Sequence, residues 1–252
     1  MASTEQRCAV VTGAAQGLGR AVALRLLKGN VRVVGADMQA EKIAALGREL
    51  GDGNFRPVTA EVSTEEGAAA AMDAALSAFG RIDILVNIAG GSGHVAIREI
   101  DDLPPSVWKS VVGSNLDATY LCCRAAVPHM RRAGFGRIVN FSSTLVGGST
   151  LWPSTVGARL AYCAAKSGID GLSRQLALDL GPANITVNVI TPEFILTEPG
   201  ARVHQRFNML EPEHQQQLRA GQRGTPGDIA EAVAFLVSDG AGHINGAFLK
   251  VG

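Results

Sequence analysis

Short apolar runs alternate along the chain with longer segments in which apolar residues recur at helical spacing. The runs are typical of strands that are buried on both faces of a parallel sheet. They span residues 8–12, 31–36, 55–62, 82–88, 136–142, 184–191 and 247–251. The helical segments span residues 17–28, 40–50, 63–79, 104–132 in two pieces, 160–180 and 226–238. This alternation predicts an α/β fold, with a doubly wound parallel sheet of about seven strands and helices on both faces.

The segments between these elements are rich in turn-forming residues. Ser63 followed by Glu66 matches a capping box, which predicts the start of a helix. Residues 192–222 contain several prolines and glutamines, and we predict a mobile loop or lid with a short helix. No tandem repeat or linker divides the sequence, so residues 1–252 are predicted to form a single domain.

The composition limits the possible partners. Hydrophobic residues make up 46% of the 252 residues and charged residues 18%, which allows a substantial core. Lys and Arg total 23, as do Asp and Glu, so bulk charge does not draw the chain to nucleic acid or to an anionic membrane. The N-terminus lacks an apolar signal core, and no apolar run reaches the ~18 residues that span a bilayer. We therefore expect a cytoplasmic protein.

Four cysteines are spread along the chain, and none forms a C-x-x-C pair or lies within a histidine cluster. A disulfide framework and a metal site are therefore not expected. We predict small buried thiols in a reducing compartment, at Cys8, Cys122, Cys123 and Cys163.

Tyr162 and Lys166 stand four residues apart in a predicted helix, so their side chains lie on one face, one turn apart. An unperturbed phenol has a pKa of ~10, and a fixed ammonium nearby lowers that pKa because it favours the phenolate. The pair is therefore a candidate acid–base centre near neutral pH. Because Tyr-x-x-x-Lys also occurs by chance in helices, the assignment depends on the motifs that precede it.

A glycine-rich turn at residues 12–19 joins the first predicted strand to the first predicted helix. Glycines allow a positive φ and close approach of a ligand to the backbone, and a helix N-terminus offers free N–H groups to a pyrophosphate. The spacing is G-x-x-x-G-x-G rather than the G-x-G-x-x-G of the standard dinucleotide fingerprint. We predict that the turn binds a dinucleotide; a turn that serves packing alone is the alternative.

Asp37 ends the second predicted strand. In nucleotide-binding α/β folds an acidic residue there accepts hydrogen bonds from the adenosine ribose and repels a 2′-phosphate. Ala36 and Met38 beside it carry no charge, and Gln16 stands in the glycine turn where an arginine would favour the phosphate. The pattern favours NAD over NADP. The alternative is an ordinary solvated carboxylate.

Together these segments resemble the short-chain dehydrogenase/reductase family, in its smaller single-domain form, over essentially the whole chain. The motifs follow the family's order: T-G-x-x-x-G-x-G at 12–19, N-I-A-G at 87–90, Asn115, Ser142-Ser143, Y-x-x-x-K at 162–166, and R-G-T-P followed by D-I-A within 223–230. The resemblance implies a Rossmann-like fold and an NAD(H)-dependent enzyme with a small-molecule substrate. It also implies assembly as a homotetramer or homodimer.

The resemblance implies a role for each site residue. Tyr162 would exchange a proton with the substrate oxygen, while Lys166 would lower the Tyr162 pKa and hold the nicotinamide ribose. Ser143 would donate a hydrogen bond to the same oxygen, and Asn115 would hold a water in a proton path to Lys166. The implied cofactor-binding residues are Gly13, Gln16, Gly17, Leu18, Gly19, Asp37, Met38, Glu61, Val62, Asn87, Ala89, Gly90, Tyr162, Lys166, Pro192, Ile195 and Thr197.

The chain departs from the family around the catalytic serine. Ser143 lies nineteen residues before Tyr162, farther than the family spacing, so residues 149–159 resemble an insertion in the substrate loop. Ser149 has the family spacing but lies in a stretch predicted to be flexible, and Ser142 is the other competitor. We expect Ser143 to be the catalytic serine.

Three further departures concern the cofactor region. Glu193 replaces the glycine of the family's Pro-Gly, which places a carboxylate near the nicotinamide. The chain ends Lys250-Val251-Gly252 instead of Asp-Gly-Gly, and Glu61 replaces the aspartate that precedes the adenine-contacting valine.

Substrate contacts are expected from segments that follow the C-terminal ends of strands, because open α/β sheets bind ligands there. These segments span 91–98, 144–159 and 193–210, and their candidate residues are His94, Trp152, Arg159 and Glu193. We hypothesise that Arg159, a cation three residues before the tyrosine, meets an anionic substrate group. Ordinary loop roles for His94 and Arg159, and a covering role for Trp152, are the alternatives.

The predicted function is NAD(H)-dependent interconversion of a secondary alcohol and a ketone. A 3-oxoacyl thioester (acyl-carrier-protein) reductase is the alternative within this class, and an NAD-binding regulator or scaffold is the alternative outside it. A smooth strip of small residues on the predicted catalytic helix fits packing across subunits or packing on its own sheet; it comprises Ala164, Ala165, Gly168 and Gly171.

Overall fold

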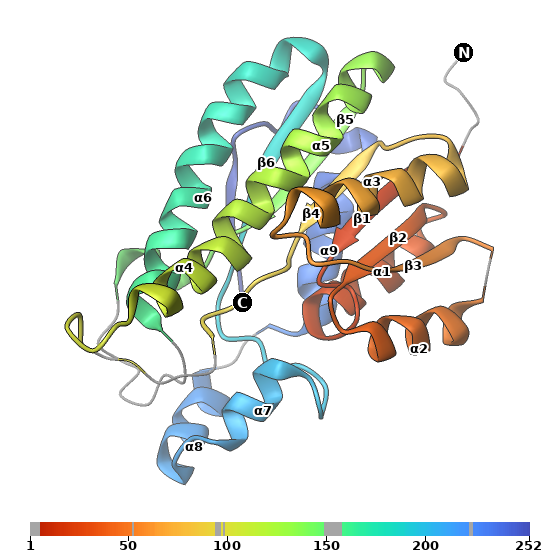
Figure 1. The fold of residues 1–252 in the computed structure, drawn as a ribbon. Helices are drawn as coiled ribbons and strands as arrows, with labels where there is room; N and C mark the ends of the chain where they lie inside the picture. The colour runs from red at the N-terminus through yellow and green to blue at the C-terminus, as the bar shows by residue number, and fades with distance from the viewer. Residues whose placement is uncertain (1–5, 52, 94–96, 98, 149–157, 222–223) are drawn as a thin grey trace.

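The computed structural model describes residues 6–51, 53–93, 97, 99–148, 158–221 and 224–252. Within these residues the centre is one parallel sheet of seven strands in the order β3-β2-β1-β4-β5-β6-β7 (Figure 1). The strands are β1 (Cys8–Thr12), β2 (Arg32–Asp37), β3 (Phe55–Thr59), β4 (Ile84–Asn87), β5 (Gly136–Phe141), β6 (Ile185–Pro192) and β7 (Phe248–Val251). The predicted doubly wound α/β fold is confirmed.

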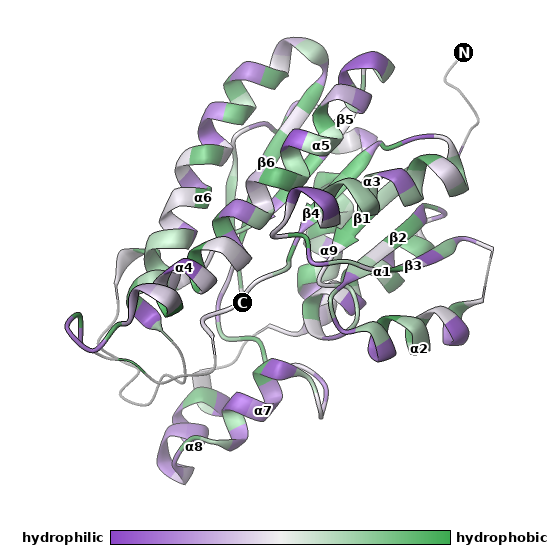
Figure 2. Ribbon diagram, viewed as in Figure 1, coloured by the Kyte–Doolittle hydropathy of each residue, from purple (hydrophilic) through white to green (hydrophobic). Residues whose placement is uncertain are grey.

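Helices cover both faces of the sheet. One face is covered by α1 (Gly17–Lys28), α2 (Ala40–Leu50) and α9 (Pro226–Leu236). The other is covered by α3 (Glu65–Phe79), α5 (Ala118–Ala133) and α6 (Arg159–Leu180), with α4 (Pro105–Val112) packed beside α6. Figure 2 shows hydrophobic colour along the central strands and a mixture of both colours on the surrounding helices. The two apolar layers explain why the strands read as continuous apolar runs rather than as alternating patterns.

The strand order brings the loops that follow β1 and β4 together at the C-terminal edge of the sheet. β1 pairs with β4, and Val11 stands opposite Val86, although β2 and β3 intervene in the sequence. In chain order, β2 and β3 therefore lie on one side of β1, and β4 to β7 lie on the other side. The C-terminal ends of β1 and β4 flank the crevice that this reversal creates, which is where open α/β sheets bind ligands.

Two further helices, α7 (Arg202–Asn208) and α8 (Pro212–Gly221), lie beyond the end of the sheet (Figure 1). The prediction of one short helix within 192–222 is therefore wrong. α7 is anchored by Phe207, which is fully buried and stacks on Phe194 with ring centroids 6.0 Å apart. α8 begins with Pro212, whose fixed φ suits the first turn of a helix.

The start of α3 also differs from the prediction. The N-cap is Thr64, whose side chain accepts a hydrogen bond from the Gly67 N–H at 3.0 Å. The Ser63 hydroxyl instead donates to Glu61, so the predicted capping box of Ser63 and Glu66 is wrong. Both Ser63 and Thr64 are good capping residues, and the extended backbone of Thr64 decides between them.

Three of the four cysteines are buried: Cys8, Cys122 and Cys123. Cys163, near the start of α6, is only partly buried and is not among the buried residues of that helix, so the prediction of a buried thiol is wrong there. Within the described residues, no cluster of three or more His, Cys, Asp or Glu could hold a metal ion. The described helices include none that is both long and apolar enough to cross a membrane.

Candidate active site

The glycine turn after β1 has a backbone that only glycine accommodates easily. Gly13 and Gly17 have φ of +68° and +59°, in the left-handed region. A Cβ on Gly19 would lie 2.0 Å from the Gly13 carbonyl oxygen. The Thr12 hydroxyl accepts hydrogen bonds from the Ile88 and Ala89 N–H groups, at 3.0 and 3.1 Å, and so ties the ends of β1 and β4 together.

The N-terminus of α1 holds a carboxylate. The Gly17 N–H donates to Glu198 Oε1 at 2.7 Å, although 181 residues separate the two. Free N–H groups and the helix dipole favour an anion at this position. Glu198 belongs to the segment after β6, so that segment reaches across the C-terminal edge of the sheet to the glycine turn.

Asp37 is buried at the end of β2, so the alternative of a solvated carboxylate is wrong. Its carboxylate accepts hydrogen bonds from the Ala15 and Gln39 N–H groups, at 3.1 and 2.9 Å. The sequence neighbours of Asp37 carry no cation, but Lys42 of α2 donates to Gln16 in the glycine turn at 2.7 Å. A lysine therefore lies beside the glycine turn, which sequence spacing did not reveal.

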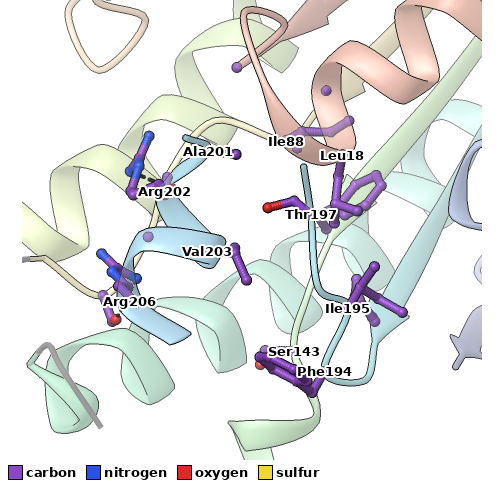
Figure 3. A pocket seen from close by; sticks show the side chains of 18 of the residues that line it. Leu18, Ile88, Ser143, Phe194, Ile195, Thr197, Ala201, Arg202, Val203 and Arg206 are labelled. Carbon is purple, nitrogen blue, oxygen red and sulfur yellow. Dashed lines mark hydrogen bonds between the residues drawn. The ribbon is translucent and has the colours of Figure 1, made fainter. Parts of the chain in front are cut away.

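A cavity of about 330 Å³ extends from the glycine turn to the start of α6 and to the segment after β6 (Figure 3). Most of the predicted cofactor residues line it: Gly13, Gln16, Gly17, Leu18, Gly19, Asp37, Ala89, Gly90, Tyr162, Lys166, Pro192, Ile195 and Thr197. Ser142, Ser143, Phe194, Arg202 and Arg206 line it as well.

Four predicted cofactor residues are not among those that line the cavity: Met38, Glu61, Val62 and Asn87. The Asn87 side chain donates to Asn140 Oδ1 at 2.8 Å and to the Cys123 sulfur at 3.4 Å, beneath the site. The bond to Asn140 links β4 to the neighbouring strand β5, and a contact of Asn87 with the cofactor stays a prediction.

Tyr162 lies in the first turn of α6, and its side chain faces the cavity. Ser143 caps a short 3-10 helix at residues 144–147 and hydrogen-bonds with Tyr162. Burial raises the pKa of the phenol, while the hydrogen bond with Ser143 and the nearby charge of Arg206 lower it by smaller amounts. The structure therefore brings Ser143 and Tyr162 together, despite their separation in the sequence.

Lys166 is fully inside the protein, one turn beyond Tyr162. Its ammonium donates to the Phe141 carbonyl at 2.7 Å and lies 5.6 Å from the centroid of the Tyr162 ring. Burial lowers the pKa of Lys166 to about 8, and Asp170 opposes this shift. Burial has the largest effect on the pKa of Tyr162 and raises it, and a lowering of that pKa by Lys166 stays a prediction.

Asn115 lies in a π-helical segment at residues 113–117, between α4 and α5. Its side-chain amide donates to the Gly91 carbonyl at 2.9 Å, and its Oδ1 accepts from the Gly91 N–H at 3.1 Å. A third bond joins the amide to the Val111 carbonyl at 2.8 Å. The side chain is completely buried and does not line the cavity, so it holds the loop after β4 in place.

Glu193 and the unusual C-terminus form one feature. The Glu193 carboxylate pairs with the ammonium of Lys250, and the Glu193 N–H donates to the Val251 carbonyl at 3.0 Å. Two departures from the family therefore compensate each other electrostatically. The carboxylate lines the cavity, but a neighbouring cation already neutralises its charge.

Of the other predicted substrate residues, the structure describes only Arg159. His94 and Trp152 lie outside the described residues, as does the competing serine, Ser149. Arg159 is the first residue of α6 and is not among those lining the cavity; its charge acts on the thiol of Cys163.

Two arginines of α7 reach the cavity instead. Arg202 donates to the Gly90 carbonyl at 3.1 Å, and Arg206 donates to the Ser92 hydroxyl at 3.1 Å. Their spacing of four residues places both on one face of a helix, a signal that the sequence contains. The signal was missed because this segment was predicted to be mainly a loop.

Comparisons with known proteins identify the family. A family model described as enoyl-(acyl carrier protein) reductase matches residues 13–252. The D-threitol dehydrogenase of Mycolicibacterium smegmatis is 36% identical over 248 residues, which cover 97% of this chain and 91% of that protein. The chain belongs to the short-chain dehydrogenase/reductase family.

Two further comparisons agree. Within this family, the 3-oxoacyl-[acyl-carrier-protein] reductase FabG of Haemophilus influenzae is 34% identical over 247 residues, covering 97% of this chain and 96% of that protein. The crystal structure of 3-ketoacyl-(acyl-carrier-protein) reductase from Brucella melitensis complexed with NADH matches with a TM-score of 0.83 at 32% identity, covering 99% of this chain and 98% of that chain. The chain is thus an oxidoreductase of the short-chain dehydrogenase/reductase family, which uses a nicotinamide cofactor.

The cavity fits such a cofactor. In the part of the chain that the structure describes, the hydroxyls of Ser142 and Thr197 are buried in the cavity lining without a hydrogen-bond partner. The glycine turn presents a helix N-terminus at one end of the same cavity, and Asp37 presents a carboxylate there. These groups match the hydroxyls and the pyrophosphate of a dinucleotide.

Proposed function

We propose that this short-chain dehydrogenase/reductase uses NAD(H) to interconvert a secondary alcohol and a ketone, with Tyr162 as acid and base. The observation that carries the proposal is the position of the phenol. Tyr162 faces the cavity that the glycine turn also lines, and it hydrogen-bonds with Ser143. A phenol in this position can exchange a proton with a substrate oxygen inside the cavity.

The neighbouring residues would support this exchange. Ser143 would donate a hydrogen bond to the substrate oxygen and stabilise the charge that develops there. Lys166, which uses one of its three ammonium protons for the Phe141 carbonyl, has two left to hold a ribose hydroxyl. Asn115 would act through the loop after β4, and a proton path at this residue remains a prediction. When bound, the cofactor supplies or accepts the hydride.

NAD is the proposed form of the cofactor because of Asp37. Its buried carboxylate lies at the end of β2, where it would accept hydrogen bonds from ribose hydroxyls and repel a 2′-phosphate. Lys42 is the cation that would favour NADP, but its ammonium donates to Gln16 and lies at the surface. A buried carboxylate outweighs an exposed ammonium, which water screens.

The test is a screen of secondary alcohols, polyols and hydroxy acids with NAD and NADP, followed by absorbance of the reduced nicotinamide. We expect kcat/KM with NAD to exceed that with NADP by more than about tenfold, because juxtaposed like charges cost several kcal/mol. Asp37→Ser should reduce this preference, whereas the control Lys42→Gln should preserve or increase it. A wild-type preference for NADP would contradict the proposal.

The second candidate is a reductase of 3-oxoacyl thioesters, because two of the compared proteins are named for that activity. Turnover of 3-oxoacyl thioesters with NADPH would favour it. A regulator or scaffold that has lost turnover is less well supported, since Ser143, Tyr162 and Lys166 are all retained beside one cavity.

We also propose assembly into a homotetramer or homodimer through α6. Gly168 packs on its own chain, because an added Cβ would lie 2.7 Å from the Leu116 side chain. A Cβ on Gly171, by contrast, would meet nothing within 4 Å, and Gly171 is exposed. The strip therefore serves packing within the chain at one end and leaves room for a second subunit at the other.

A further inference from the structure

The cavity has a positively charged corner beside the loop that follows β4. Arg202 and Arg206 extend from the same side of α7 (Figure 3). Their guanidinium groups converge over Gly91, since a Cβ placed on that residue would lie 3.0 Å from Arg202 Nη1 and 3.7 Å from Arg206 Nη2. Both residues line the cavity and both are partly buried.

No carboxylate balances these two charges among the residues that the structure describes. Arg202 donates to the Gly90 carbonyl, and Arg206 donates to the Ser92 hydroxyl and the Gly93 carbonyl. All three acceptors are neutral. The Nε of Arg206 is buried and has no hydrogen-bond partner among the described residues. Burial and then the charge of Arg202 lower the pKa of Arg206, so the corner is unfavourable until an anion enters it.

The corner lies near the proposed acid–base residue rather than near the phosphate end of the site. The charge of Arg206 acts on the phenol of Tyr162. The cofactor pyrophosphate is expected at the other end, at the N-terminus of α1, where the Gly17 N–H already binds a carboxylate. An anion bound by Arg206 would therefore belong to the substrate.

We propose that the substrate is a secondary alcohol or ketone that also carries a carboxylate, and that Arg206, with Arg202 beside it, binds this carboxylate. The inference rests on the function proposed above and narrows its substrate class to hydroxy acids and oxo acids. The planar guanidinium presents paired N–H donors that match the two oxygens of a carboxylate. The same residues would then orient the substrate so that its alcohol or ketone oxygen faces Tyr162.

A purely structural role makes a different prediction. The bonds from Arg202 and Arg206 to the loop after β4 also hold α7 against that loop. If the arginines served only this purpose, their removal would impair all substrates alike. If they also bind a carboxylate, their removal would impair charged substrates selectively.

The experiment uses pairs of substrates that differ only in charge, 3-hydroxybutyrate with its primary amide and 4-hydroxypentanoate with its primary amide. With the wild-type protein and NAD, kcat/KM should favour the acid of a pair by about tenfold to a hundredfold, the range of a charge-assisted hydrogen bond. Arg206→Gln should abolish most of this preference, mainly by raising KM for the acid, and Arg206→Lys should retain part of it. The matched control is Arg48→Gln, an exposed arginine of α2 that does not line the cavity, which should keep the preference.

Two results would overturn the inference. One is an equal loss of kcat/KM for acid and amide in Arg206→Gln, which would leave only the structural role. The other applies if the wild type turns over none of the four compounds. In that case 3-hydroxybutyrate is titrated calorimetrically into the NADH complexes of the wild type and of Arg206→Gln. The inference is contradicted if neither protein binds the compound or if both bind it equally. The proposed function is tested separately: if that function is correct but the inference about the carboxylate is wrong, the protein still oxidises other secondary alcohols.

Discussion

At the scale of single residues, the proposed chemistry depends on which serine meets the phenol. Ser142 and Ser143 both line the cavity, but they differ in their contacts. Ser143 hydrogen-bonds with Tyr162, whereas the Ser142 hydroxyl is buried and has no partner in the described part of the chain. Adjacent residues at the end of a strand point to opposite sides, so only one of them can face Tyr162 directly.

This difference predicts unequal effects of removing the two hydroxyls. Ser143→Ala should lower kcat by on the order of 10²- to 10³-fold, because a hydrogen bond to the developing oxyanion is lost. Ser142→Ala should keep kcat close to the wild-type value, because its hydroxyl could contribute to cofactor binding but not to the chemical step at saturating NAD. Steady-state kinetics with one alcohol and saturating NAD measure both. Equal losses in the two variants would contradict the assignment of Ser143.

The sequence predicted the identities of these residues better than their electrostatics. Tyr162, Ser143 and Lys166 line one cavity, as the motif order implied. The orientation of the Lys166 ammonium was not predictable, because it depends on the Phe141 carbonyl of another strand. Arg206, whose charge lowers the Tyr162 pKa, comes from a segment in which the sequence predicted one short helix without giving its position.

At the scale of elements, the segment after β6 closes the site by reaching the N-terminus of α1. The Glu198 carboxylate accepts a hydrogen bond from the Gly17 N–H, and the Thr197 side chain lies beside the same glycine. A pyrophosphate bound there would face a carboxylate of the same sign. We therefore predict that Glu198 gives up this hydrogen bond when the cofactor binds, so that the segment competes with the dinucleotide.

Removal of this charge should strengthen cofactor binding. Glu198→Gln should lower the Kd for NADH about two- to fivefold, since a carboxylate at a helix N-terminus contributes 0.3–1 kcal/mol. Isothermal titration calorimetry measures the Kd directly. The control is Glu211→Gln, an exposed carboxylate on the same segment, which should leave the Kd unchanged. A higher Kd in Glu198→Gln would show that the carboxylate assists binding.

Elements with strong periodicity were predictable, and elements that depend on distant contacts were not. β1 and α1 begin and end where the apolar pattern indicated. The position of α7 within 192–222 was not predicted, because its packing depends on Phe194 and on the loop after β4, which lies more than a hundred residues earlier in the chain. The N-cap of α3 is Thr64 rather than the predicted Ser63, and these two neighbours have similar N-cap propensities, so the sequence alone could not decide between them.

At the scale of the whole molecule, buried thiols link stability to pH. Burial raises the pKa of Cys8 and Cys123 to about 12 and raises that of Cys122 as well. An exposed thiol in the unfolded chain has a pKa of ~8.5. Below that pH both states are protonated. Above it only the unfolded chain loses the protons, so stability falls as pH rises toward 12. Lys166, with its lowered pKa, has the opposite effect between about 8 and 10.5.

The three thiols should outweigh the single lysine. We expect the free energy of unfolding to fall from pH 8 to pH 10.5, and to fall less steeply in Cys123→Ala, by about 1.4 kcal/mol per pH unit above pH 9. Urea denaturation at several pH values, under reducing conditions, measures the slope. The comparison of slopes is independent of any stability that the substitution itself removes. Identical slopes in the two proteins would contradict the prediction.

The most direct test of the whole account compares Tyr162→Phe with the wild type in two measurements on the same preparations. Fluorescence titration gives the Kd for NADH, and stopped-flow absorbance gives the rate of hydride transfer. We predict that Tyr162→Phe binds NADH as the wild type does but transfers hydride on the order of 10²- to 10⁴-fold more slowly, because the substrate oxygen has lost its proton donor and acceptor. Hydride transfer within about tenfold of the wild-type rate, with NADH binding intact, would contradict the account.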